Sequence, residues 1–173
     1  MKKLIFLALI WMTSTANVLA KEYDITPKKN YRWIIWPIYS VFDGWTPRDA
    51  DYLCTNGYLE GKDSARPEPT TYVCPNGLTL NNETIVSESE MTIRTGGQII
   101  LKDNSQVGNS NAPINLSSRG EIKTEGGTNT INGSVTASGN ITLKKTQVGG
   151  AVTSQGGEIK TEQSGNEIQG NIT

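Results

Sequence analysis

Short segments in which aliphatic and polar residues alternate recur along the second half of the chain. One segment has the form G-x-apolar-x-[LT]-x, and a second, [IV]-x-G-x-[IV]-T, follows it. Residues two apart face the same side of a strand, so each segment predicts a strand with one apolar face. The paired positions are Ile99/Leu101, Ile122/Thr124, Ile141/Leu143 and Ile159/Thr161 in the first segment, and Ile131/Val135, Val148/Val152 and Ile168/Ile172 in the second.

The segments belong to an internal repeat. GEIKTE occurs at residues 120–125 and again at 157–162, and turns of the chain begin at Gly97, Gly120, Gly139 and Gly157, after a looser turn near Asn76. The extra residues GNSNAP at 108–113 lengthen one turn. Strands this short bury little alone, but stacking them about 4.8 Å apart lines their apolar residues into interior columns. The pattern predicts an all-β fold, a single-stranded parallel β-helix. A sandwich would need longer strands, and the regular columns argue against disorder.

One outward position carries alternating charge. Lys102, Glu125, Lys144 and Glu162 each stand five residues after the opening glycine of their turn. Stacking would place opposite charges on successive turns. An exposed ion pair contributes only about 0–1 kcal/mol, so we expect this charge column to select the stacking register rather than to supply stability. The alternative is coincidence on a face rich in lysine and glutamate.

The aromatic residues are concentrated before residue 76. Trp33, Trp36, Tyr39 and Trp45 lie close together in the sequence there. One interpretation is a plug over the end of the repeat core, since an open stack needs a cap. The other is a platform for a sugar or a partner, because aromatic faces stack on flat apolar surfaces. We favour the plug, and assign residues 21–75 to a capping region and 76–173 to the repeat domain.

A short helix is expected within the capping region. Thr46 fits its N-cap and Pro47 its first turn, while Asn56 and Gly57 would end it. Cys54 would then lie in the last turn. In an oxidising compartment Cys54 and Cys74 would pair, which stabilises the chain by about 3 kcal/mol on the chain-entropy estimate. Two reactive thiols are the alternative.

Residues 1–20 are typical of a secretory signal peptide. Two lysines precede an apolar run at 4–12, and Val18 and Ala20 occupy the −3 and −1 positions of a cleavage site. A retained anchor is the alternative, but a spanning helix needs about 20 apolar residues. No later stretch is apolar enough to cross a bilayer as a helix. We expect export to the periplasm, the outer-membrane surface or the medium.

The amino-acid composition excludes several kinds of binding and catalytic site. The chain has 173 residues, a formal net charge of −1 and no histidine. Near-zero charge argues against nucleic-acid binding, and the lack of histidine excludes His-based triads and His-ligated metal sites. The Gly-Gly pairs recur as turn elements, and the grouped aspartates precede the repeat. We therefore expect neither an enzyme nor a cofactor.

The pattern GNITLKKTQVGGAVTSQGGEIKTE resembles the polymer-forming, bactofilin-like β-helix repeats of bacteria, and exported versions of them in surface proteins associated with MSHA-type pili. The resemblance covers about residues 97–173 and implies a right-handed parallel β-helix with a scaffold or assembly role and no catalytic residues. Bactofilins lack signal peptides, and residues 21–75 are outside the pattern. The repeats are also similar in style to those of autotransporter passengers, but the membrane barrel expected after such a passenger does not follow them in this sequence.

The leading hypothesis is therefore an exported, non-enzymatic structural or surface-assembly protein. The last segment, IQGNIT, is not followed by a polar cap, and an unpaired strand edge is a template for another chain. We expect head-to-tail self-association or docking onto another envelope protein. The alternatives are a module that binds polysaccharide through Trp33, Trp36 and Trp45, and the remnant of a larger surface adhesin.

Overall fold

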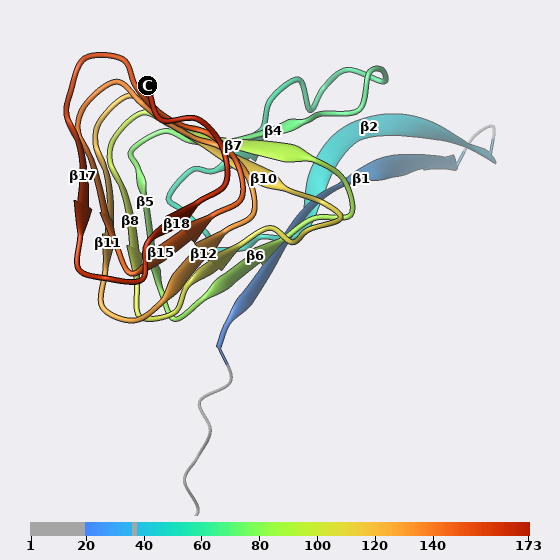
Figure 1. The fold of residues 1–173 in the computed structure, drawn as a ribbon. Coiled ribbons are helices and arrows are strands. Elements are labelled where there is room, and N and C mark those ends of the chain that lie inside the picture. The colour runs from blue at the N-terminus through green and yellow to red at the C-terminus, as the bar shows by residue number, and fades with distance from the viewer. Residues whose placement is uncertain (1–19, 36–37) are drawn as a thin grey trace, which may run out of the picture.

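The protein is a stack of parallel β-coils with a long hairpin at one end (Figure 1). The structure is a computed structural model that describes residues 20–35 and 38–173. These residues form strands and no helix. Trp36 and the expected signal segment, apart from Ala20, lie outside the described residues.

Three sheets form the walls of the stack. Sheet A contains, in spatial order, β18 (Glu167–Ile168), β15 (Thr146–Val148), β12 (Asn129–Ile131), β9 (Gln106–Val107), β6 (Thr84–Val86), β1 (Glu22–Ile35) and β2 (Ile38–Asp49). Sheet B contains β16 (Val152–Ser154), β13 (Val135–Ala137), β10 (Ile114–Ser118), β7 (Met91–Thr95), β4 (Thr71–Cys74) and β3 (Tyr58–Leu59). Sheet C contains β17 (Ile159–Glu162), β14 (Ile141–Lys144), β11 (Ile122–Glu125), β8 (Ile99–Lys102) and β5 (Leu78–Asn81).

Each coil takes one strand from each sheet, so the five strands of sheet C correspond to five coils. Neighbouring coils pair in parallel, and the predicted parallel β-helix is confirmed. The coils begin with β4, a few residues before the composition changes near residue 76.

The expectation of two strands per coil is wrong, because the second segment divides into two strands on different walls. Ile131 ends β12 in sheet A, and Val135 begins β13 in sheet B. Gly133 lies at the corner between them, where an added Cβ would come 2.3 Å from the carbonyl oxygen of Ile114 in the coil below. Only a residue without a side chain lets the two backbones approach so closely.

The extra residues at 108–113 form the expected longer loop between β9 and β10. Its turn is held by the side chain of Asn109, whose Oδ1 accepts hydrogen bonds from the backbone N–H groups of Asn111 and Ala112, both at 2.9 Å. The corresponding corner between β12 and β13 has only three residues, 132–134. The loop therefore projects from a corner that is tight in the later coils.

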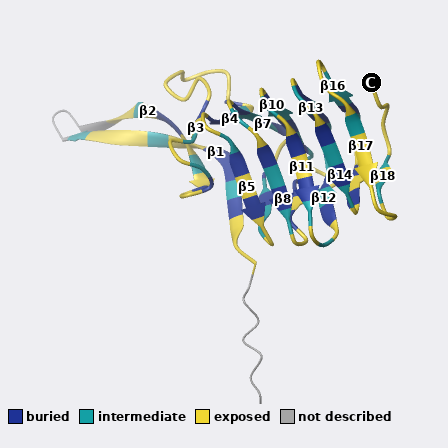
Figure 2. Cartoon of the chain, turned by 90° about the vertical axis from the view of Figure 1, so that its left-hand side faces the viewer, coloured by how far each residue is buried: buried dark blue, intermediate teal, exposed yellow. Residues whose placement is uncertain are grey.

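The aliphatic residues form continuous interior columns. The buried stretches of successive coils are dark blue in Figure 2. In sheet C, Ile99, Ile122 and Ile141 are aligned and fully buried. In sheet A the equivalent column is Val107, Ile131 and Val148. Burying each such side chain stabilises the fold by about 1.5–3 kcal/mol, which is why the coils are stable only when stacked.

The N-terminal segment pairs with the first coil at two places. The start of β1 pairs in parallel with β6, and β3 pairs antiparallel with β4. The helix expected from Thr46 is absent, because Thr46 and Pro47 lie in β2 and pair with Lys28 and Pro27 of β1. Strand pairing with β1 satisfies the backbone groups of this segment. An isolated helix of about ten residues would be only marginally stable in water.

The expected disulfide is confirmed. Cys54 and Cys74 form it, with Cα atoms 5.8 Å apart. Cys54 lies in a turn rather than in a helix, and Cys74 lies at the end of β4. The bond therefore fastens the N-terminal segment directly to the first coil.

Candidate functional site

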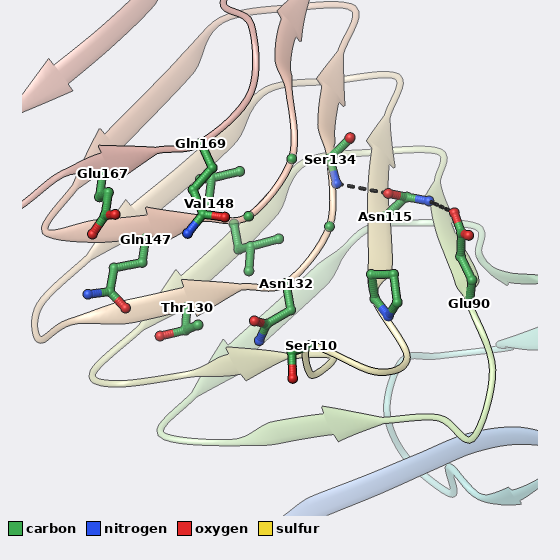
Figure 3. Close-up of a pocket in the computed structure, with 15 residues that line it drawn as sticks. Glu90, Ser110, Asn115, Thr130, Asn132, Ser134, Gln147, Val148, Glu167 and Gln169 are labelled. Atoms are coloured by element: carbon green, nitrogen blue, oxygen red, sulfur yellow. Dashed lines mark hydrogen bonds between the residues drawn. The ribbon is translucent and has the colours of Figure 1, made fainter.

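A groove runs across three successive coils at the corner between sheets A and B (Figure 3). Its volume is about 520 Å³. Sheet A contributes a row of outward side chains, Thr130, Gln147 and Glu167, which the strand register places on successive coils. The loop at 108–113 projects beside this row and contributes Ser110 and Pro113.

One side of the groove is fixed by a hydrogen-bonded chain. The Nδ2 of Asn115 donates to Oε1 of Glu90 at 3.0 Å, and the backbone N–H of Ser134 donates to Oδ1 of Asn115 at 2.8 Å (Figure 3). On the floor, Nδ2 of Asn132 donates to the carbonyl oxygen of Gly108 at 3.0 Å. These contacts cross from one coil to the next, so the polar lining is held by the stacking itself.

The remaining groups in the groove are suited to binding hydroxyl groups. Gln147, Gln169 and Glu167 are exposed, and no hydrogen bond from their side chains is found among the described residues. Amides donate and accept at once, and a carboxylate accepts. In residues 20–35 and 38–173, no three His, Cys, Asp or Glu side chains gather into a group that could hold a metal ion.

Sequence reasoning missed this groove. Its residues are ordinary polar positions within the repeat, and the concavity arises only where the longer loop stands beside tight glycine corners. The sequence signal for the groove was a difference in length: one turn has the six residues GNSNAP at a corner where later turns have only NGS or GGA.

The aromatic residues of the hairpin differ in exposure along its length and do not form one flat platform. Trp45 is only 5% exposed, and its Nε1 donates to the carbonyl oxygen of Ser64 at 2.7 Å. Phe42 packs edge-on against Trp45 and against Tyr31, with ring centroids 5.9 and 6.3 Å apart. Trp33 is 70% exposed. Trp45 is thus largely buried whereas Trp33 is exposed, and the two rings do not share one exposed face.

The other predicted members of the aromatic cluster are located only in part. The backbone of Tyr39 lies in β2 and pairs with Ile34, while Trp36 is outside the described residues. The structure therefore places Trp33 and Trp45 in different surroundings on one hairpin.

The charge column is present as two registered pairs. Lys102 and Glu125 are in register and form an ion pair, with Oε2 of Glu125 3.6 Å from Nζ of Lys102. Lys144 and Glu162 are in register in the next two coils. Glu125 also contacts Lys123 on its own strand at 2.5 Å. The Lys123 ammonium, with a smaller contribution from Lys102, holds the pKa of Glu125 below its ordinary value.

The base of the hairpin is fastened by charge. The guanidinium of Arg48 in β2 contacts Asp24 of β1 at 3.4 Å and also pairs with Glu88 between β6 and β7. This pairing lowers the pKa of Glu88. Arg48 therefore links the hairpin to the second coil as well as to its own partner strand.

Comparison of the chain with protein-family models, curated proteins and solved structures finds no match. In the part of the chain that the structure describes, no helix has the length and apolar character needed to span a bilayer.

Proposed function

We propose that this protein is an exported, non-enzymatic structural component of the bacterial envelope, built on a rigid stack of β-coils. The observation that carries the proposal is the unbroken column of fully buried aliphatic residues shared by successive coils. Such a stack resists bending and has a regular surface along its length. The similarity of its repeats to bactofilin-like proteins supports the same role.

The polar groups of the groove support a binding rather than a catalytic role. Glu90 is hydrogen-bonded to Asn115, and the lining is otherwise made mostly of amides, hydroxyls and glycine backbone, with Glu167 the other carboxylate. General acid–base catalysis needs a positioned group that changes its protonation state. Amides and hydroxyls orient ligands without doing so.

The proposed assembly role uses strand edges. The outermost strands are β2 and β18 in sheet A, β3 and β16 in sheet B, and β5 and β17 in sheet C, but the outer edge of β16 is already hydrogen-bonded to residues 171–173. Unpaired backbone groups at an edge can pair with another chain. End-to-end association of copies, or docking onto another envelope protein, would use these edges.

Fractionation of the native host tests export and assembly together. The expected result is a processed protein beginning at Lys21 in the envelope or the medium, with cross-links to itself or to an envelope protein. The Ala20→Arg variant should accumulate as an unprocessed precursor, while Asn17→Gln, outside the −3 and −1 positions, should be processed normally. Detection of the full-length chain only in the cytoplasm would contradict the proposal.

A second candidate function, polysaccharide binding, is favoured by the groove. Gln147 and Glu167 lie on adjacent coils at the strand-stacking distance, a spacing at which an extended sugar chain could be contacted repeatedly. Binding to immobilised glycans should weaken in Gln147→Ala and Glu167→Ala and persist in Gln98→Ala, which lies outside the groove. A glycan array without binding would exclude this candidate.

A further inference from the structure

The hairpin of β1 and β2 projects from the stack as an arm (Figures 1 and 2). Only Glu22, Tyr23 and Asp24 of β1 pair with a coil, through β6. The rest of β1 pairs with β2 alone. We call residues 31–33 and 40–42, which face one another across this ladder, the outer arm.

The outer arm exposes large apolar side chains on both of its faces. Tyr31 and Trp33, at alternate positions, share one face, and both are more than half exposed. Val41 pairs with Arg32 on the opposite face and is also exposed. A second folded protein would cover one face and leave the other in water. An environment that surrounds the arm would cover both.

A row of aromatic contacts holds the exposed ring of Tyr31 in place. Tyr31 packs edge-on against Phe42, Phe42 packs against the buried Trp45, and the ammonium of Lys29 lies 5.2 Å from the centre of the Trp45 ring. The exposed end of the arm is therefore braced from the interior. Rings that are already ordered lose little conformational freedom on binding.

The arm is basic in a chain that is otherwise acidic. Residues 27–43 contain Lys28, Lys29 and Arg32 but only one acidic residue, Asp43. None of these three cations makes an ion pair with another described residue. Because Lys29 lies over the Trp45 ring, Lys28 and Arg32 are the cations available to an external anion.

We propose that the outer arm docks onto a bilayer surface that contains anionic lipid. Trp33 and Tyr31 enter the headgroup region, where amphipathic aromatic rings are favoured, and Lys28 and Arg32 contact the lipid phosphates. Residues 31–33 and 40–42 carry no amide or carboxylate side chain; Asn30 and Asp43 adjoin them, and the amide of Asn30 donates to Thr46. The exposed apolar side chains on both faces fit immersion of the arm in the headgroup region, where lipid surrounds it, and the positive charge fits the lipid phosphates.

Vesicle co-sedimentation of residues 21–173, which span the described fold apart from Ala20, tests the proposal. We expect binding to vesicles containing about one-third phosphatidylglycerol and much weaker binding to phosphatidylcholine alone. Reversing one charge, Arg32→Glu, should weaken binding about tenfold or more. Trp33→Ser should weaken it to a similar extent, and added salt should weaken binding of the unmodified chain.

Two matched variants outside the arm serve as controls. Tyr52→Ser removes another strongly exposed aromatic residue, and Arg119→Glu reverses an exposed cation on the stack. Both should bind like the unmodified chain. Circular dichroism should be unchanged in all four variants, because none of the four side chains makes a hydrogen bond or ion pair with described residues. The melting temperature should change little, since the one printed contact of Tyr52 is its exposed ring beneath the Lys21 ammonium.

Several results would overturn the proposal. Failure of the folded chain to bind either vesicle would do so, as would binding that Arg32→Glu and Trp33→Ser leave unchanged. Trp33-dependent retention on a polysaccharide, without vesicle binding, would assign the arm to a sugar ligand. Trp33-dependent dimerisation in the absence of lipid, again without vesicle binding, would assign it to a second copy of the chain.

Discussion

The hydroxyl oxygens of Thr124 and Thr146 lie 2.6 Å apart in the buried interior of the stack. Thr124 occupies the column in which the coils on either side place Leu101 and Leu143. Its Oγ1 also accepts a hydrogen bond from the backbone N–H of Lys144 at 2.7 Å. The Thr124 side chain thus takes the place of a backbone carbonyl in the ladder between β11 and β14. The hydroxyl of Thr146 in turn donates to the carbonyl oxygen of Lys144.

Thr124→Val should therefore destabilise the protein, although it makes the column more apolar. It leaves the N–H of Lys144 without its acceptor in a buried place, at a cost of about 1–3 kcal/mol. Thr142→Val on the outward face of β14 is the control and should change stability by less than about 0.5 kcal/mol. Chemical denaturation measures both. An unchanged or increased stability in Thr124→Val would refute the role of the hydroxyl.

Gly133→Ala should destabilise the corner between β12 and β13. The new Cβ would lie 2.3 Å from the carbonyl oxygen of Ile114, so the backbone would have to shift, at a cost of about 1–3 kcal/mol or more. Gly149→Ala is a matched control at the next corner, where the nearest atom would be 3.6 Å away. Thermal unfolding should separate the two variants, and equal melting temperatures would show that the close approach is not limiting.

Lys144→Glu should lower the melting temperature more than Lys145→Glu. Lys144 is in register with Glu162, so the substitution puts like charges opposite one another, at a cost of about 0.2–1 kcal/mol. Lys145 follows the strand, in a turn with φ of 48°, outside the column. The difference should shrink in high salt because exposed charges are screened. Equal effects of the two substitutions would end the interpretation of the charge column as a register device.

Stability should fall at alkaline pH through the ionisation of Tyr72. Burial, helped by the carboxylate of Asp51, raises the pKa of Tyr72 above its ordinary value of about 10. The neutral phenol is thus favoured in the folded state. The stability gained from keeping Tyr72 neutral is fully present below pH 10, and it is lost as the pH rises through the raised pKa of Tyr72 in the folded state.

Tyr72→Phe should lose less stability than the unmodified chain when the pH is raised from neutral to above 10, and Tyr52→Phe, an exposed control, should lose the same amount as the unmodified chain. Denaturation at each pH measures the loss. Part of the alkaline loss should persist in Tyr72→Phe, because burial and the hydrogen bond to Glu83 also raise the pKa of Tyr23. An identical pH dependence in Tyr72→Phe and the unmodified chain would contradict the assignment.

The stacked coils were predictable because their signal is local and repeated. Equivalent positions of successive segments are occupied by Ile99, Ile122 and Ile141. Because the segments are alike, stacking them in register buries all three side chains in the same way. The disulfide followed from there being two cysteines in a sequence whose first 20 residues predict export. The loop at 108–113 followed from the count of extra residues in one turn.

The errors arose where a local rule competed with a distant partner. Thr46 and Pro47 have the form of a helix start, but β1 lies alongside them and supplies a strand ladder. Gly133 was placed within a strand, although contact with Ile114 in the coil below makes it a corner. Trp33 and Trp45 are near in sequence, yet only Trp45 reaches the core.

The amino-acid sequence by itself determined the stacking, the period and the inward columns, because these depend on the spacing of side chains within each turn. Only the tertiary structure decided how many walls a coil has, which aromatic rings are buried and where a groove opens. Those features depend on contacts between residues that lie a full coil or more apart, and no single segment carries that information.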